Sequence, residues 1–209
     1  GTLCTAVGKD ALGGAASGND CTAIGYDALN LSTGINNTAV GSGAMDASVT
    51  GQDNVAVGKD ALGGASHADV DQNVAIGSGS LASASLVKGN IVAIGYAALA
   101  ANIAEDNVAI GCSALAASAN SPSVDNIAIG ARSLDIANAA GVVRNIAIGT
   151  DALGGSLTLG DNIAIGNDSM LVAAGAAQNI MIGSDTGKTI STGSNNVAIG
   201  YNSMSAADR

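Results

Sequence analysis

The chain has 209 residues with 30 Gly, one Pro, three Tyr and no Phe or Trp, and its 17 acidic and 7 basic residues give a net charge of −10. Because 47% of the residues are hydrophobic, the composition excludes intrinsic disorder, and the near absence of Pro excludes collagen. The acidic balance, without any Lys/Arg cluster, argues against nucleic acid as a partner, and no apolar run is long enough for membrane insertion.

A triplet of the type Ala-Ile-Gly or Ala-Val-Gly recurs along the whole chain at intervals of 16 to 19 residues. We number each repeat from the glycine of its triplet, which is position 0. Twelve copies are present, and they align with one another without any homologue because the same residue types return at each position. The repeat glycines are Gly8, Gly25, Gly41, Gly58, Gly77, Gly95, Gly111, Gly130, Gly149, Gly166, Gly183 and Gly200.

The residues before each repeat glycine predict a short strand, the first over residues 4–7 and the last over residues 196–199. Positions −3 and −1 are β-branched in every copy, position −2 is Ala in eleven copies, and position −4 is Asn in nine. Since alternate strand residues point to opposite faces, we expect the Val and Ile face to be buried and the other face to carry Asn and Ala. Stacked amides would bond from copy to copy, and this Asn ladder comprises Asn37, Asn54, Asn73, Asn107, Asn126, Asn145, Asn162, Asn179 and Asn196.

After each glycine, Ala or Ser at +3 and Leu or Met at +4 predict a second short strand or a bend whose Leu returns to the core. The segment from there to the next Asn absorbs all the length differences. Its longer versions, residues 63–72, 116–125 and 135–144, are expected to be loops on one flank, and the single proline, Pro122, lies in one of them.

A unit of about 17 residues cannot bury its own apolar face, but stacked units can. We therefore expect an all-β fold in which residues 1–209 form one repeat domain, a parallel β-solenoid of about twelve coils. At about 4.8 Å per coil, the rod would be on the order of 55–60 Å long. Coils this thin have no room for Phe or Trp, which explains their absence.

The repeats resemble the head repeats of trimeric autotransporter adhesins, whose Val-Ala-Ile-Gly core is matched by residues 73–77 and 107–111. They are more similar to the Asn-Thr-Ala-Ile-Gly-Tyr-x-Ala-Leu repeats of phage and large-virus fibre proteins, as in residues 21–29 and 37–41. The resemblance covers essentially the whole chain and implies an obligate homotrimer of left-handed parallel β-rolls. The intervals of 16 to 19 residues are longer than the coils of the bacterial heads, and this difference in period favours the resemblance to the viral fibre repeats.

The resemblance leads us to expect a non-enzymatic structural segment of a viral or phage fibre, at the virion surface, which spaces or presents a host-attachment tip. The implied partners are the chain itself as a homotrimer, adjoining fibre or virion proteins, and a host surface receptor. The alternative is the head of a bacterial trimeric adhesin at the cell surface. No catalytic, cofactor-binding or metal-ligating residue is expected, and no cofactor.

Two other solenoid classes fit less well. The hexapeptide helix of acyltransferases needs an aliphatic residue every six positions and a catalytic His between coils, neither of which the sequence provides. An ice-binding solenoid needs a regular Thr array. At position −3, however, Thr occurs only in the first three copies, as Thr5, Thr22 and Thr38.

Residues 183–189, Gly-Ser-Asp-Thr-Gly-Lys-Thr, resemble a phosphate-binding loop but are one residue short of the required spacing, and no helix propensity follows them. We interpret them as a degenerate repeat with an altered turn, in which Gly187 replaces the usual Leu. His67 is the only His, and although Asp69 and Asp71 are near it in sequence, it falls in a loop and is interpreted as solvated.

The three cysteines are too few and too scattered for a zinc site. Cys4 and Cys21 both occupy position −4, in adjacent copies, and their spacing is compatible with a disulfide or with two stacked free thiols; we favour the thiols. Cys112 follows its repeat glycine and is expected to be unpaired.

Acidic residues recur at position +2, where paired carboxylates would suit a glycan-cleaving tailspike. Without aromatic platforms for sugar rings, we interpret them as a solvated column: Asp10, Asp27, Asp60, Asp151, Asp168 and Asp185. Tyr26, Tyr96 and Tyr201 share position +1, which favours a structural role at the rim over contact with a receptor.

Overall fold

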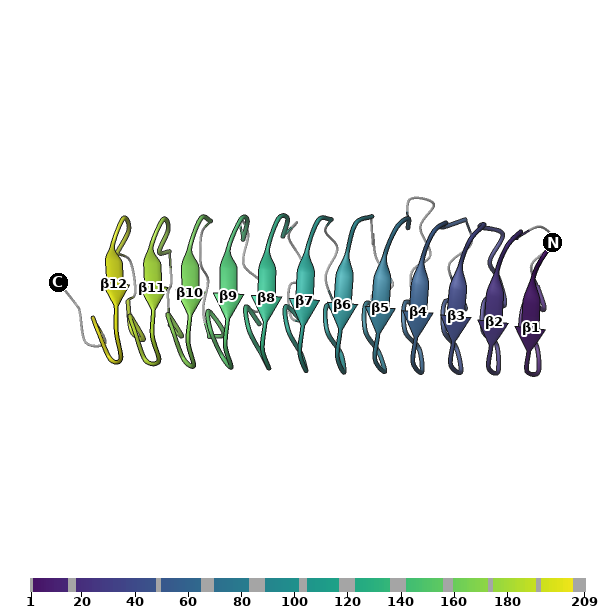
Figure 1. Ribbon diagram of the computed structural model, residues 1–209, viewed down its shortest axis with the longest axis horizontal. Helices are drawn as coiled ribbons and strands as arrows, with labels where there is room; N and C mark the ends of the chain where they lie inside the picture. Colours follow the sequence, from purple (N-terminus) through teal and green to yellow (C-terminus); the bar gives the residue numbers. More distant parts are fainter. Residues whose placement is uncertain are drawn as a thin grey trace.

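The computed structural model describes residues 2–14, 18–47, 50–64, 70–82, 89–101, 105–116, 123–135, 142–155, 160–172, 175–190 and 193–204 as an all-β parallel solenoid (Figure 1). The described residues include no helix, and so none that could cross a membrane. The strands are β1 (Thr5–Val7), β2 (Thr22–Ile24), β3 (Thr38–Val40), β4 (Val55–Val57), β5 (Val74–Ile76), β6 (Val92–Ile94), β7 (Val108–Ile110), β8 (Ile127–Ile129), β9 (Ile146–Ile148), β10 (Ile163–Ile165), β11 (Ile180–Ile182) and β12 (Val197–Ile199).

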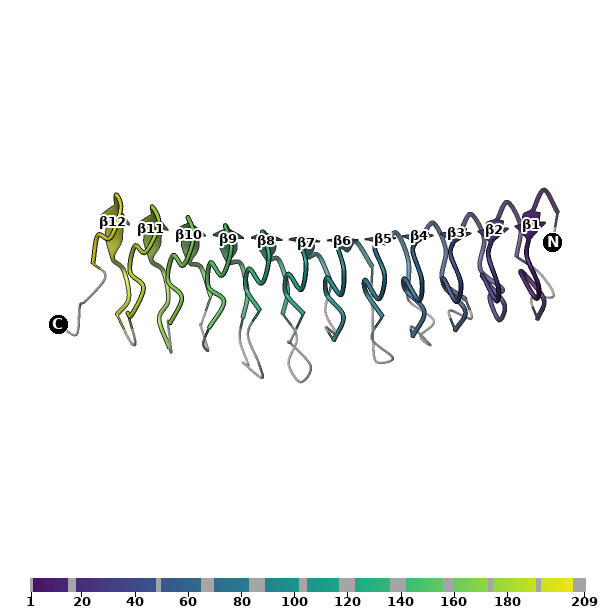
Figure 2. The same cartoon turned by 90° about the horizontal axis from the view of Figure 1, so that it is seen from below.

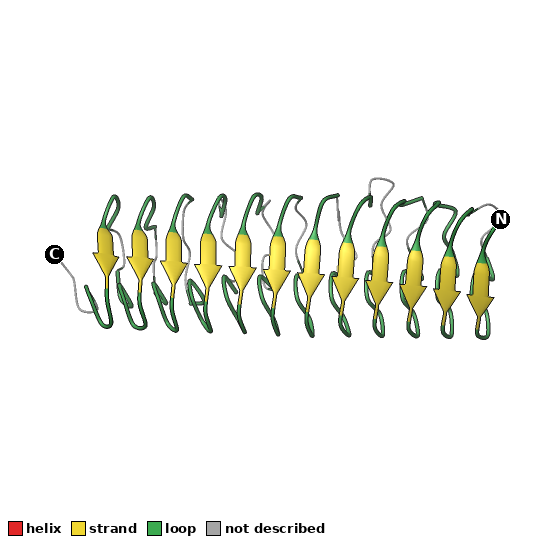
Figure 3. Cartoon of the chain, viewed as in Figure 1, coloured by secondary structure: helices red, strands yellow, loops and turns green. Residues whose placement is uncertain are grey.

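All twelve strands form one parallel sheet in sequence order, with β1 and β12 at its two ends (Figures 1 and 3). Each strand pairs with the next in the same register, so that position −3 always faces position −3, as Val108 faces Ile127. Seen from the second direction, the strands lie along one side of the rod (Figure 2). Identical positions therefore stack into columns that run the length of the rod.

The repeat glycines end the strands with a positive φ that L side chains rarely adopt, and in every unit but the last a Cβ there would meet the backbone of the next unit. Gly130 has a φ of +136°, and a Cβ on it would lie against the carbonyl oxygen of Gly149 in the next unit and 2.6 Å from that residue's carbonyl carbon. The close approach lets the Gly130 amide donate a hydrogen bond of 2.8 Å to the carbonyl of Ile110 in the preceding unit. Backbone hydrogen bonding between units thus continues beyond the strand.

The prediction that the Val and Ile face would be buried was wrong. Ala at position −2 is the fully buried strand residue, with 0% exposure at Ala109 and Ala147, whereas the flanking positions −3 and −1 are only half-buried or exposed. The reason is space, because the sheet lies so close to the opposite wall of the coil that a methyl group fills the gap. The larger β-branched side chains are therefore on the outer face of the sheet.

The opposite wall is formed by the Leu or Met at position +4. This residue returns to the core as expected, but it lies in a turn, and within the described residues each unit has one strand and not the second strand that was the other expectation. Leu115 is fully buried and has a φ of +51°, a left-handed conformation that L residues rarely adopt. Burial of the side chain and a 2.9 Å hydrogen bond from its amide to the carbonyl of Ser133 offset this strain. The same conformation recurs at position +4 from Leu12 to Met204.

One unit exchanges large and small residues between the two walls. Met181 replaces the usual Ala at −2, and Gly187 replaces the usual Leu at +4. A Cβ on Gly187 would lie 3.0 Å from the sulfur of Met181 and 3.0 Å from Cδ1 of Ile190. The methionine therefore occupies the space that Leu fills in the other units, and the total core volume is kept.

This exchange predicts a compensating pair of substitutions. Gly187→Leu should overpack the unit and lower the free energy of unfolding by about 1–3 kcal/mol, and Met181→Ala should leave a cavity and lower it by about 2–4 kcal/mol. The double variant restores the arrangement of the other units and should recover most of both losses. Urea denaturation of the four proteins measures the coupling, and additive losses would contradict the exchange.

Candidate functional site

The main unpartnered feature of the described chain is the outer face of the sheet, which we call the outward β-branched face. It consists of the −3 and −1 side chains of all twelve strands. These are Thr5, Val7, Thr22, Ile24, Thr38, Val40, Val55, Val57, Val74, Ile76, Val92, Ile94, Val108, Ile110, Ile127, Ile129, Ile146, Ile148, Ile163, Ile165, Ile180, Ile182, Val197 and Ile199.

The outward β-branched face is uncharged and accessible along its whole length, and it is apolar apart from the hydroxyl groups of Thr5, Thr22 and Thr38. In the middle of the rod Ile76 is 37% and Ile127 36% exposed, and at the two ends Val7 reaches 57% and Ile199 68%. Rungs of three residues about 4.8 Å apart cover on the order of 500 Å² in flat projection. That is near the upper end for the largest apolar patch of a monomeric protein, about 300–600 Å².

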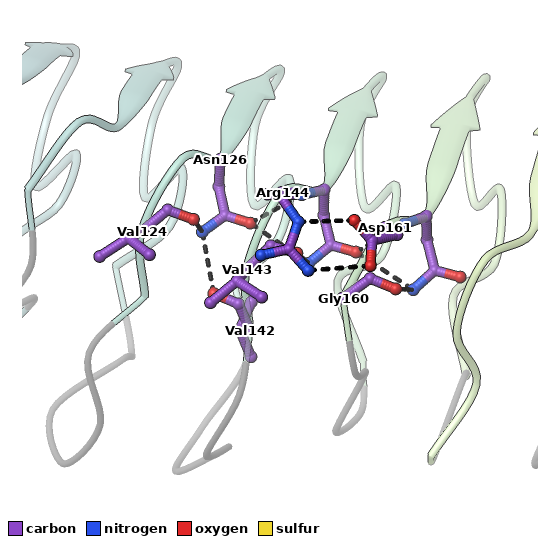
Figure 4. A network of polar contacts seen from close by, with 9 residues as sticks. Val124, Asn126, Val142, Val143, Arg144, Gly160 and Asp161 are labelled. Atoms are coloured by element: carbon purple, nitrogen blue, oxygen red, sulfur yellow. Dashed lines mark hydrogen bonds and ion pairs between the residues drawn. The ribbon is translucent and has the colours of Figure 1, made fainter.

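Inside the coil, the Asn residues at position −4 are hydrogen-bonded from unit to unit (Figure 4). The backbone amide and Nδ2 of Asn126 donate to Oδ1 of Asn107 at 3.0 and 3.2 Å, and Oδ1 of Asn126 accepts the equivalent bonds from Asn145. Nδ2 of Asn126 also lies 3.0 Å from the carbonyl of Val142. Each buried amide is therefore satisfied by its neighbours and by the wall of its own coil.

The ladder has one interruption, at Ile91, whose amide donates to Oδ1 of Asn73 at 3.0 Å but whose side chain has no amide to continue the series. Hydrogen bonds join Asn37 to Asn73 and then Asn107 to Asn196. Among the described residues, the buried asparagines thus bond to one another and to backbone carbonyls as a structural network.

Ion pairs between neighbouring units lie on the surface of the rod. Arg144 donates from Nε and NH2 to the two carboxylate oxygens of Asp161 at 2.7 and 3.0 Å (Figure 4), and its guanidinium lowers the pKa of that carboxyl. Arg132 makes the same two-pronged contact with Asp151 at 2.7 and 2.6 Å. These exposed pairs join successive units, and each contributes modestly to stability.

The acidic column at +2 is largely ion-paired with basic residues of the same chain. Lys9 pairs with Asp10, and Lys59 with Asp60. Lys188 lies 2.8 Å from Asp168 and 2.7 Å from Asp185, and these two carboxylates raise its pKa. The lysine of the phosphate-loop-like segment is therefore neutralised by carboxylates, and Thr186 in the same segment is buried and donates to the carbonyl of Gly200.

The three tyrosines are exposed and lie far apart along one column, after β2, β6 and β12. Nζ of Lys9 lies 5.2 Å from the ring centroid of Tyr26, a cation–π distance. The structure brings no second aromatic ring to any of them among the described residues, so they do not form a shared platform.

Cys4, Cys21 and Cys112 are free thiols. Cys4 and Cys21 take the place of the ladder asparagines, because their thiols donate to the carbonyls of Gly18 and Gly34 at 3.2 and 3.4 Å. Burial raises the pKa of Cys21. Cys112 is exposed on a turn.

His67, Asp69 and Pro122 lie outside the described residues. Asp71 is described, and its carboxylate accepts a 2.8 Å hydrogen bond from the backbone amide of Gln52. In the described ranges, no group of three or more His, Cys, Asp or Glu side chains is placed to hold a metal ion.

The outward β-branched face is a candidate functional surface that the sequence reasoning missed, since it assigned those side chains to the core. The available signal was the size limit at position −2, where Ala recurs in eleven copies although Val and Ile alternate with it. A column in which the smallest apolar side chain recurs with a single exception, Met181, marks the confined side of a strand. Comparison of the chain with family models, curated proteins and solved structures finds no match.

Proposed function

We propose that this chain is a non-enzymatic structural segment of a surface fibre, in which three copies associate through the outward β-branched face. The observation that carries the proposal is that face itself, a stripe of Thr, Val and Ile side chains that the chain leaves uncovered from β1 to β12. With one circuit of chain per strand, each copy would contribute twelve coils to a rod on the order of 55–60 Å long.

A second copy of this chain is the occupant that fits the face best. Its ridges repeat at the spacing of a parallel sheet, about 4.8 Å, and the same spacing on a partner lets the two sets of side chains interdigitate. The face is uncharged although the chain carries a net charge of −10, so association through it keeps the charged columns apart.

The mechanical role follows from the continuous bonding along the rod. Backbone hydrogen bonds, the Asn residues at −4 and the two-pronged Arg–Asp pairs all join one unit to the next. Bending or opening the rod at any point would break several of these contacts at once. Such a segment is suited to space or present a host-attachment tip at a virion surface, or, as the alternative, to form the head of a bacterial trimeric adhesin.

The mass of the protein in solution tests the assembly. We expect a species of about three times the 19.8 kDa chain by light scattering. Ile146→Lys puts a charge on the face at β9, away from both ends, and should shift the protein to monomers, because an unpaired buried charge is costly. Thr150→Lys is the matched control, since it adds the same charge to an exposed turn of the same unit and should leave the trimer intact.

A monomeric wild-type chain would overturn the assembly. If that monomer also inhibited ice recrystallisation, the free face would instead favour an ice-binding solenoid, for which Thr5, Thr22 and Thr38 now have the required outward orientation. Trimeric protein that loses its assembly equally with either lysine variant would contradict the assignment of the interface to this face.

A further inference from the structure

The outward β-branched face changes in composition from one end of the rod to the other. Position −3 is Thr in β1–β3, Val in β4–β7, Ile in β8–β11 and Val in β12. Position −1 changes in the same direction, with Val in three of the first four strands and Ile in all strands from β5 onward. One end of the face is thus smaller and bears hydroxyl groups, and the other is larger and wholly aliphatic.

We propose that this gradation fixes the direction and the register in which copies of the chain associate, so that Thr5, Thr22 and Thr38 of each copy meet the same residues of the others. The inference rests on the proposed self-association through the face. It assigns a specificity role to three side chains and to the borders at which position −3 changes residue type.

Direction follows from the threonine hydroxyls. In the part of the chain that the structure describes, these hydroxyls have no hydrogen-bond partner within the chain. If two copies were antiparallel, Thr22 would be opposite Ile180 and Thr38 opposite Ile163, and the hydroxyls would lose water without gaining a partner. In a parallel arrangement, the hydroxyls of one rung lie at the same level and can donate to one another across the interface.

Register follows from the three borders at which position −3 changes residue type: a hydroxyl gives way to a methyl between Thr38 and Val55, and the side chain gains a methylene between Val108 and Ile127 and loses one between Ile180 and Val197. A slip of one rung would place Thr38 of one copy at the level of Val55 of another, and Val108 at the level of Ile127. Within the Val block or the Ile block the same slip changes nothing, so the blocks alone cannot specify alignment. The borders at 38/55, 108/127 and 180/197 can specify alignment, because a slip there places a hydroxyl beside a methyl group or changes the local volume by one methylene, and closely packed interfaces are sensitive to such changes.

Distances between spin labels in the assembled protein test the direction. In a background with Cys4→Ser and Cys112→Ser, a single label is attached through Tyr201→Cys, beyond β12, or through Lys9→Cys, beyond β1; both positions are well exposed, and the remaining Cys21 is buried. A parallel assembly should give only short label-to-label distances for each protein. Distances of about 50 Å, the span of eleven rungs, would show antiparallel chains and overturn the proposal.

A pair of variants tests the threonines themselves. Thr22→Ile combined with Thr38→Ile removes the polar end of the face and should add a long-distance population from antiparallel or slipped chains, with the mass of the assembly unchanged. The matched control, Val74→Ile combined with Val92→Ile, enlarges two aliphatic rungs and should keep the single short distance. An unchanged distance distribution in the threonine variant would overturn the role of these residues.

The two proposals fail separately. Antiparallel assemblies would overturn the direction-setting role and leave self-association through the face standing. A wild-type protein that is monomeric by light scattering would overturn the self-association and with it this inference.

Discussion

Gly130→Ala is expected to lower the free energy of unfolding by about 3–5 kcal/mol, from backbone strain and overpacking together. At a φ of +136°, Gly130 lies in a region that L residues rarely adopt, and the added Cβ would be forced against the carbonyl group of Gly149 and 3.1 Å from the amide nitrogen of Thr150. These atoms belong to the backbone and cannot rotate away. Two units in the middle of the rod would have to separate, and urea denaturation measures the loss.

Gly200→Ala is the matched control, because Gly200 holds the same position in the last unit. Its φ is +119°, but a Cβ there meets no atom within 4 Å. This variant therefore carries the backbone strain without the clash and should lose about 1–2 kcal/mol. Equal losses at Gly130 and Gly200 would mean that the close approach between units contributes nothing to the choice of glycine.

Asn126→Leu is expected to lower the free energy of unfolding by about 2–5 kcal/mol, since it leaves several buried polar groups without partners. Leu has the same branching and number of side-chain heavy atoms as Asn and keeps the backbone bond to Asn107, but it offers no Oδ1 to the amide of Asn145 and no Nδ2 to the carbonyl of Val142. The loss combines the missing hydrogen bonds with the larger volume of the two methyl groups, and thermal and urea denaturation measure it.

Asn196→Leu makes the same substitution at the end of the series. Asn196 is only half-buried; it donates to Oδ1 of Asn179 and is the last residue of the series. We expect a loss of about 1 kcal/mol, the net contribution of one hydrogen bond. An unchanged stability of the Asn126 variant, or losses that do not differ between the centre and the end, would refute the stabilising role of the stacked amides.

Much of the fold could be predicted because the residues that determine it recur at the same positions from repeat to repeat. A glycine at position 0, Asn at −4 and β-branched residues at −3 and −1 return at nearly constant spacing, and equal spacing in a parallel stack places like residues beside like. The parallel sheet and its in-register pairing follow from this regularity. So do the positions of the strands, each of which ends at the residue before its glycine.

The exchange between Met181 and Gly187 was visible in the sequence only as two separate exceptions to the repeat. Only the structure shows that the two residues share one space in the core, because a strand residue and a turn residue six positions later have no fixed spatial relation in the sequence. The left-handed conformation of the Leu and Met residues at +4 also could not be predicted, because these residue types rarely adopt it.

By itself, the sequence determined that this protein is a regular stack of short parallel strands, since that is the arrangement in which twelve similar units cover one another's apolar surface. Only the tertiary structure decided which face of the strand lies inside. An alternating pattern has two faces, and hydrophobicity alone does not say which one is inside; it favoured the Val and Ile side, whereas the narrow coil holds Ala at −2 in all units but that of Met181 and mostly Asn at −4. That steric limit places the β-branched side chains outside and leaves the face through which we propose the copies associate.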